Sequence, residues 1–127
     1  MLALGQFLLA NEYGPLWRSA DTGTNWTQIT CPIYDIRCFA IVGNTVYAAN
    51  GGLVRSLDSG ATWSVVPTTF SVLSLTSHGT NLFAAASDGL HYLDSGGIWH
   101  DAGFAGKECM LIYAFDTLRR WYEGESA

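Results

Sequence analysis

Three aspartates recur along the chain at nearly constant spacing, and carboxylates in such a pattern could bind a metal. Asp21, Asp58 and Asp94 are separated by 37 residues (21 to 58) and then by 36 (58 to 94). Each is followed two positions later by a glycine, an order that also occurs in calcium-binding loops. Calcium takes about six to eight oxygen ligands, usually from several carboxylates, and each segment supplies one. We therefore predict that these aspartates are structural and that no metal site exists.

Other residues suited to catalysis are few and lack the expected spacing. The three histidines, His78, His91 and His100, form no HxH or HExxH pattern, and no GxSxG elbow surrounds a serine. A glycosidase needs two carboxylates flanking the scissile bond. The remaining acids fall mostly in predicted turns or near the C-terminus, without an evident pair: Glu12, Asp35, Asp88, Asp101, Glu108, Asp116, Glu123 and Glu125. The sequence thus predicts no catalytic residue and no cofactor.

The charge balance limits the classes of partner. The 127 residues carry a net charge of -5, with basic side chains only at Arg18, Arg37, Arg55, Lys107, Arg119 and Arg120. Binding phosphates requires clustered cations, so nucleic acid and anionic membranes are not expected partners. No run approaches the roughly 18 apolar residues of a spanning helix, so membrane insertion is not predicted. The opening MLALGQFLLA lacks the basic start and cleavage site of a signal peptide, and we expect a strand there.

The three cysteines, Cys31, Cys38 and Cys109, form no CxxC pair, which argues against a zinc or redox site. Cys31 and Cys38 could form a local disulfide if the chain is secreted. We favour three free thiols in strand positions. The sequence does not indicate the compartment.

The aspartates belong to an internal repeat. Residues 19–26, 56–63 and 92–99 read SADTGTNW, SLDSGATW and YLDSGGIW. Upstream, FAIVGNTVYAA at 39–49 matches LTSHGTNLFAA at 75–85, and FLLAN at 7–11 aligns with VYAAN at 46–50. A repeat of this length is typical of solenoids and propellers.

Each repeat is predicted to contain four short strands separated by turn-forming clusters. In the second copy we expect strands at about 36–42, 45–49, 53–56 and 62–66. Four antiparallel strands in so short a unit are typical of a β-propeller blade. A parallel β-helix is the main rival, but its rungs are usually shorter. We predict an all-β, partial propeller of about three blades, at 1–31, 36–67 and 72–103, with 109–127 as the start of a fourth blade or a divergent tail.

The repeated segment resembles the Asp-box, or BNR repeat, whose pattern is Ser/Thr-x-Asp-x-Gly-x-Thr/Ser-Trp/Phe. The second copy fits every position, whereas Asn25 departs from the pattern in the first copy, and Tyr92 and Ile98 depart from it in the third. The resemblance covers residues 5 to 105 and implies structural residues at Ser19, Asp21, Gly23, Trp26, Ser56, Asp58, Gly60, Thr62, Trp63, Asp94, Gly96 and Trp99.

The motif is expected to form the hairpin between the third and fourth strands of each blade. Gly23, Gly60 and Gly96 would take the positive φ of a tight turn. The aspartates would accept hydrogen bonds from N–H groups of the same turn. The tryptophans would be buried against neighbouring strands, where removing a fully buried ring costs about 3–5 kcal/mol.

Propellers with this repeat include sialidase-like enzymes, sortilin-like receptors and photosystem II assembly factors. Sialidases, by this resemblance, need three clustered arginines, an acid/base aspartate and a Tyr–Glu pair, and the Arg-Ile/Leu-Pro signature of the family is absent. We therefore predict a non-catalytic binding module for a protein or carbohydrate. A fragment of a sialidase-like hydrolase and an assembly factor are the alternatives. Family members are often secreted or cell-surface proteins.

Three blades are too few for a propeller, which typically has about four to eight. Exposed blade faces must be covered for a repeat protein to remain soluble. Two explanations are open: the natural protein is longer, or copies of the chain associate to close the ring. We favour the first, because the repeat ends abruptly after residue 115.

Overall fold

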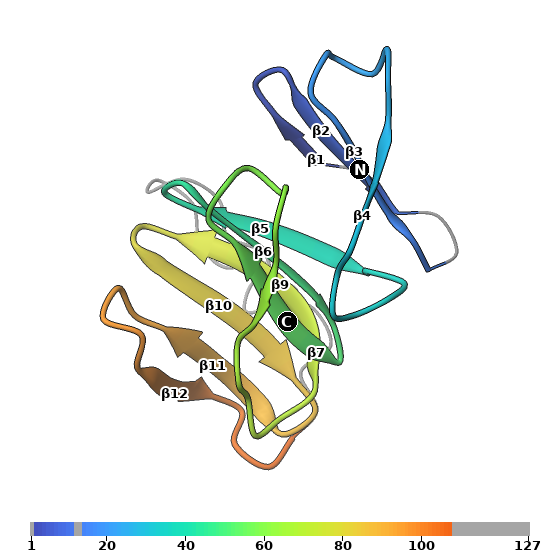
Figure 1. Ribbon diagram of the computed structural model, residues 1–127. Coiled ribbons are helices and arrows are strands. Elements are labelled where there is room, and N and C mark those ends of the chain that lie inside the picture. The colour runs from blue at the N-terminus through green and yellow to red at the C-terminus, as the bar shows by residue number, and fades with distance from the viewer. Residues whose placement is uncertain (1, 12–13, 108–127) are drawn as a thin grey trace, which may run out of the picture.

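The computed structural model describes residues 2–11 and 14–107. These residues form twelve β-strands in three four-stranded antiparallel sheets, and they contain no helix that could cross a membrane (Figure 1). In each sheet the spatial order of the strands equals their order along the chain. The protein is therefore an all-β arc of propeller blades.

The sheets are named blades 1, 2 and 3. Blade 1 contains β1 (Leu2–Leu4), β2 (Phe7–Asn11), β3 (Leu16–Ser19) and β4 (Thr27–Ile29). Blade 2 contains β5 (Cys38–Val42), β6 (Thr45–Asn50), β7 (Gly52–Ser56) and β8 (Ser64–Val65). Blade 3 contains β9 (Val72–His78), β10 (Asn81–Ala86), β11 (Gly89–Leu93) and β12 (Trp99–Gly103). The predicted segment 109–127 lies outside the described residues.

The opening apolar run forms two strands, where the sequence led us to expect one. Leu2 pairs with Leu9 and Leu4 with Phe7, so the chain reverses at the intervening Gly5. Gly5 has a φ of 62°, a left-handed conformation that favours glycine. Blade 1 therefore has its own innermost strand.

Strand pairing corrects the alignment of the first repeat by one residue. Ser19 pairs with Leu8, and its equivalent Ser56 pairs with Val46. Leu8 is therefore the counterpart of Val46, although the sequence alignment placed Phe7 there. The difference arises because β2 and β3 are joined by a longer connection than the single residue between β6 and β7.

The two faces of each blade meet different neighbours. Val46 and Ala48 on β6 belong to one apolar cluster with Leu9 and Leu16 of blade 1. Tyr47, which lies between them in sequence, packs in the cluster shared with blade 3. This is the alternation of side chains expected along a strand. Each face of blade 2 therefore carries the apolar side chains that pack against one neighbouring blade.

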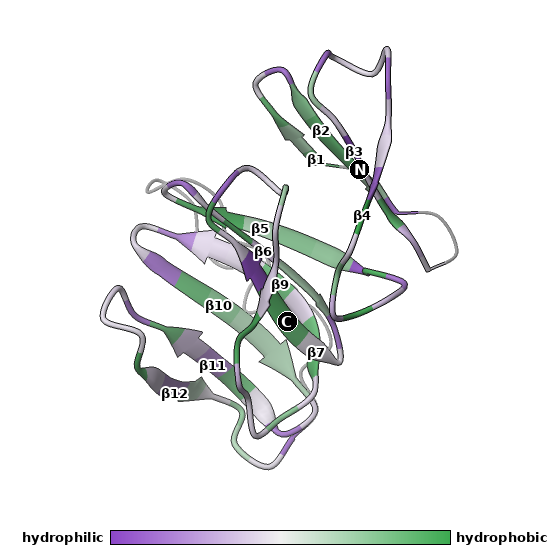
Figure 2. Ribbon diagram, viewed as in Figure 1, coloured by the Kyte–Doolittle hydropathy of each residue, from purple (hydrophilic) through white to green (hydrophobic). Residues whose placement is uncertain are grey.

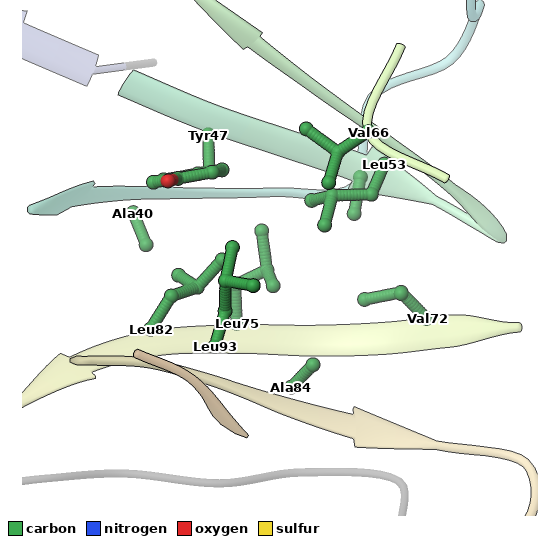
Figure 3. Packing of buried hydrophobic residues seen from close by; sticks show 10 residues of the cluster. Ala40, Tyr47, Leu53, Val66, Val72, Leu75, Leu82, Ala84 and Leu93 are labelled. Carbon is green, nitrogen blue, oxygen red and sulfur yellow. The ribbon is translucent and has the colours of Figure 1, made fainter. Parts of the chain in front are cut away.

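The core lies between the blades. Tyr47 and Leu53 of blade 2 point toward Leu75, Leu82 and Leu93 of blade 3 (Figure 3). Burying one leucine side chain contributes about 1.5–3 kcal/mol. Figure 2 shows largely hydrophobic ribbons at β1, β2, β5 and β10, and hydrophilic residues both at hairpins and on β11 and β12.

Candidate functional site

The hairpins between the third and fourth strands contain the repeated aspartates and are called the aspartate hairpins (residues 19–26, 56–63 and 93–99). In the second, the buried Ser56 hydroxyl accepts the N–H of Gly60 at 2.8 Å and donates to Asp58 at 2.7 Å. Asp58 also accepts the N–H of Thr62 at 2.8 Å and the Thr62 hydroxyl. The first hairpin repeats these bonds with Ser19, Asp21, Gly23 and Asn25.

These bonds favour the ionised carboxylate. Hydrogen bonds from the Thr62 side chain and backbone, and from Ser56, lower the pKa of Asp58 from 3.8 to about 2. Bonds from Asn25 and Ser19 lower the pKa of Asp21 to about 2. Both carboxylates are held by hydrogen bonds from their own turn.

The third hairpin is one residue shorter than the others, which corrects the alignment of Tyr92 with the motif serine. Leu53 to Ser56 in β7 corresponds to Leu90 to Leu93 in β11, because Leu93 pairs with Leu82 as Ser56 pairs with Val46. Leu93 is 6% exposed and takes the buried position of the serine. The deletion lies between this position and the aspartate.

Without the serine hydroxyl, Asp94 accepts the turn amides itself. Its Oδ1 receives the N–H groups of Gly96 and Ile98, both at 2.9 Å, and Oδ2 lies 2.7 Å from His100 Nε2. The His100 bond is the largest cause of the lowered pKa of Asp94. The positive φ, 84°, falls at Gly97 and not at the predicted Gly96, whereas Gly23 and Gly60 have φ of 92° and 91°. The first two hairpins each have two successive left-handed residues, Thr22 and Gly23 or Ser59 and Gly60, whereas the third has Gly97.

The tryptophans cap the hairpins but are less buried than predicted. Trp63 Nε1 donates to the Gly60 carbonyl at 2.9 Å, and Trp26 Nε1 donates to Gly23 at 3.1 Å. Trp63 and Trp99 are half-buried against the clusters between blades, whereas Trp26 is 37% exposed. Each ring faces the preceding blade, and no preceding blade covers Trp26 among the described residues.

A histidine between two aspartates was not recognised in the sequence. His91 Nε2 lies 2.7 Å from Asp88 and Nδ1 lies 3.3 Å from Asp101, while the ring stacks on Phe70 at 3.9 Å. Asp101 is the register partner of His91 across β11 and β12, a contact that depends on strand pairing and that no sequence motif indicates. The two carboxylates sit on opposite nitrogens and so do not converge on one point. Within residues 2–11 and 14–107, no group of His, Cys, Asp or Glu is arranged for a metal ion.

Two equivalent arginines have different surroundings. Arg18 of blade 1 donates from Nε to the Ser59 carbonyl at 3.0 Å, and its guanidinium lies 4.4 Å from the Phe7 ring centre. The Arg55 residue of blade 2 is exposed, and its guanidinium has no hydrogen bond or ion pair with another residue of the described chain. We attribute the difference to the shortened hairpin, which changes the carbonyl positions facing Arg55.

Arg55 lies in the inter-blade groove, which we define as two adjoining hollows between blades 2 and 3. Their volumes are 460 Å³ and 560 Å³. Both are lined by Arg55, Leu93, Ser95 and Gly97. The first also includes Thr45, Tyr47, Thr80 and Asp94, and the second includes Val65, Val66, Pro67 and Trp99. The groove thus combines apolar walls, hydroxyl groups and one cation.

The described cysteines are not placed for nucleophilic chemistry. Cys31 and Cys38 are free thiols, and Cys109 lies outside the described residues. Burial raises the pKa of Cys38 to about 11 and also raises that of Cys31. Neither thiol is appreciably ionised at neutral pH.

Comparison with known proteins supports the fold alone. No protein-family model matches the sequence, and no curated protein matches it. Among solved structures, 13 chains are similar. One, described as "YCF48 bound to D1 peptide", shares 19% identity with a TM-score of 0.54, over 72% of this chain and 34% of its own. The chain therefore spans about a third of that propeller.

Proposed function

We propose that the protein is a non-catalytic propeller module that binds a segment of a partner protein in the inter-blade groove. The observation that carries this proposal is the Arg55 guanidinium, which lines both hollows and is paired with none of the described residues. We also propose that the aspartate hairpins are Asp-boxes and serve as structural turns beside this groove.

The groove suits an extended peptide with a carboxylate. A guanidinium presents a planar fork that pairs with a carboxylate through two parallel hydrogen bonds. The walls formed by Leu93 and Trp99 offer apolar contacts, and the hydroxyl groups of Thr45 and Ser95 offer polar ones. Asp94 also lines the groove, but its oxygens are already held by Gly96, Ile98 and His100.

The comparison with a peptide-bound propeller supports a protein ligand over a carbohydrate. The similar solved chain is bound to a peptide, so this fold can present a peptide-binding surface. A dedicated assembly factor would use the same binding mode with one partner. Sialidase chemistry has no support in the geometry, because Arg18 is occupied by Ser59 and Phe7 and Arg55 faces the next blade.

The test is selection of peptides from a phage-displayed random library on the immobilised chain. Selected peptides are then titrated by fluorescence anisotropy against the wild type and Arg55→Ala. We expect acidic side chains or a free C-terminal carboxylate in the selected peptides. Loss of a charge-assisted pair is expected to weaken binding about 10–100-fold.

Arg37→Ala is the matched control, because Arg37 is also exposed but does not line the groove. Its affinity for the selected peptides is expected to equal that of the wild type. Equal binding by Arg55→Ala would place the site elsewhere. Binding on a glycan array with no peptide selected, or turnover of a fluorogenic sialoside, would contradict the proposed function.

A further inference from the structure

Arg55 is available in the inter-blade groove because it lacks the contact that its counterpart makes. At the junction of blades 1 and 2, Arg18 Nε donates to the Ser59 carbonyl of the next aspartate hairpin at 3.0 Å. Ser95 follows the repeated aspartate of the third hairpin as Ser59 follows that of the second, and it lines both hollows beside Arg55. The Arg55 guanidinium makes no such bond within the described chain. It is therefore free to pair with a ligand.

The groove crosses blades 2 and 3 from their first strands to their last. The first hollow reaches the turns between the first two strands of each blade, at Gly43 and Thr80. The second hollow reaches Pro67, which follows β8, and Trp99 of β12. Arg55 of β7 lines both hollows. Neighbouring strands lie about 4.8 Å apart, so the groove spans about 14 Å, the length of about four extended residues.

The two ends of the groove differ in charge. Arg55 is the one charged residue that lines the second hollow, whose other walls include Pro67 and Trp99. The first hollow is lined by Arg55 and also by Asp94, whose side chain is 31% exposed. Among the residues that the structure describes, no other charged side chain lines the groove. A carboxylate is therefore favoured at Arg55, and the end of the groove in the first hollow carries a negative charge.

Asp94 keeps its charge at neutral pH because its own turn binds the ionised carboxylate. Hydrogen bonds from His100, Ile98 and Gly96 lower its pKa. These bonds hold the oxygens but leave the negative charge, so a second ligand carboxylate in the first hollow would be repelled. Between partly exposed groups the effect is modest, because solvent screens both charges.

We propose that the groove selects a segment that offers one carboxylate to Arg55 and no second carboxylate to the end lined by Asp94. This inference rests on the proposed function, because it requires a peptide bound through Arg55. The partner is then an extended segment with an isolated acidic residue. A general attraction between a cation and an acidic chain would give the opposite order, since each added carboxylate would strengthen binding.

The test uses a selected peptide with one carboxylate, titrated by fluorescence anisotropy at low salt and about pH 8, where ordinary histidines are neutral. Each other position of the peptide is replaced in turn by glutamate and by its uncharged isostere glutamine. At one position, the glutamate peptide should bind the wild type about three- to fivefold more weakly than the glutamine peptide. Asp94→Asn should abolish this difference, because it removes the charge and keeps a side-chain oxygen for the turn amides.

Asp58→Asn is the matched control, because it makes the same change in an equivalent hairpin that does not line the groove. It alters the net charge equally and should leave the difference between the two peptides unchanged. A measurement on the wild type alone adds a second check. The difference should shrink in about 0.5 M sodium chloride, because salt screens interactions between exposed charges.

The outcomes separate this selectivity from the function on which it rests. If Arg55→Ala binds the parent peptide as tightly as the wild type, the proposed function and the selectivity both fail. The selectivity alone is contradicted if binding depends on Arg55 but the library yields runs of acidic residues, or if glutamate binds as well as glutamine at every position. A difference that persists in Asp94→Asn, shown to be folded by far-UV circular dichroism, also contradicts it.

Discussion

At the scale of single residues, each repeated aspartate is a polar support for its own turn. Asp58 accepts two bonds from Thr62 and one from Ser56, and Asp21 has the same kind of partners. Asp94 has no serine partner, and its carboxylate is instead in hydrogen-bond contact with His100. One deletion was therefore accommodated by redistributing hydrogen bonds around the same carboxylate.

The lowered pKa of Asp58 predicts a pH-dependent stability. Because its pKa falls from 3.8 to about 2 on folding, the carboxylate stabilises the fold above pH 3.8, and this stabilisation is lost as the pH drops toward 2. Asp58→Asn should lower the free energy of unfolding at neutral pH by about 0.5–1 kcal/mol, since solvent screens this exposed group. Urea unfolding at several pH values measures the difference, which should shrink in acid.

Asp35→Asn is the control for this measurement. Asp35 is exposed, and its φ of 52° is one that asparagine also tolerates. We expect no comparable pH-dependent difference. A difference in the free energy of unfolding between the wild type and Asp58→Asn that stays constant from neutral to acid pH would contradict the explanation.

At the scale of elements, the repeat gives each blade two faces with different neighbours. The hairpin tryptophan belongs to the face directed at the preceding blade, as Trp63 and Trp99 show. Gly60 fits this packing closely, because an added methyl group there would come within 2.6 Å of Leu9 in blade 1. The hairpin is thus both a turn and a contact between blades.

Replacement of two tryptophans should distinguish these roles. Trp63→Ala removes a ring packed between blades 1 and 2 and should cost up to about 3 kcal/mol, below the value for a fully buried ring. Trp26→Ala should cost clearly less, because that ring is 37% exposed. Thermal and urea unfolding of each variant beside the wild type measures the two losses of stability. Equal losses of stability in the two variants would show that the tryptophans stabilise the fold mainly through the hairpin hydrogen bonds and not through packing between blades.

At the scale of the molecule, the three blades are not equally joined. Strand β5 of blade 2 lies close to β9 and β10 of blade 3, whereas no comparable close approach joins the strands of blades 1 and 2 within the described chain. Side chains such as Leu9 and Leu16 connect blade 1 to blade 2. Figure 1 shows blade 1 set apart from the other two. The arc is therefore asymmetric.

This asymmetry predicts uneven protection from hydrogen exchange. Amides of β1–β4 should exchange faster than those of β5–β7 and β9–β11, because local opening of blade 1 breaks fewer contacts. Hydrogen–deuterium exchange followed by mass spectrometry on the wild-type chain measures this. Uniform protection across the three blades would contradict the prediction.

The sequence alone determined the repeat and the class of fold. The spacing of Asp21, Asp58 and Asp94, with turn residues between short β-branched runs, predicts successive antiparallel blades because turn chemistry and strand alternation are local properties. Two strands at the N-terminus were read as one, and the register of the first repeat was misplaced by one residue, because pairing depends on hydrogen bonds between segments.

Only the tertiary structure decided what the repeated residues contact. The structure placed Leu93 at the position where a serine was expected, and it left Trp26 exposed. It brought His91 into contact with Asp88 and Asp101. It also showed that Arg18 hydrogen-bonds to Ser59, whereas the equivalent Arg55 lines the inter-blade groove. Equivalent positions in a repeat share a conformation but not a neighbour. Their burial and hydrogen bonding depend on the adjacent blade, which lies about one repeat away along the chain. A local sequence pattern therefore does not predict these contacts.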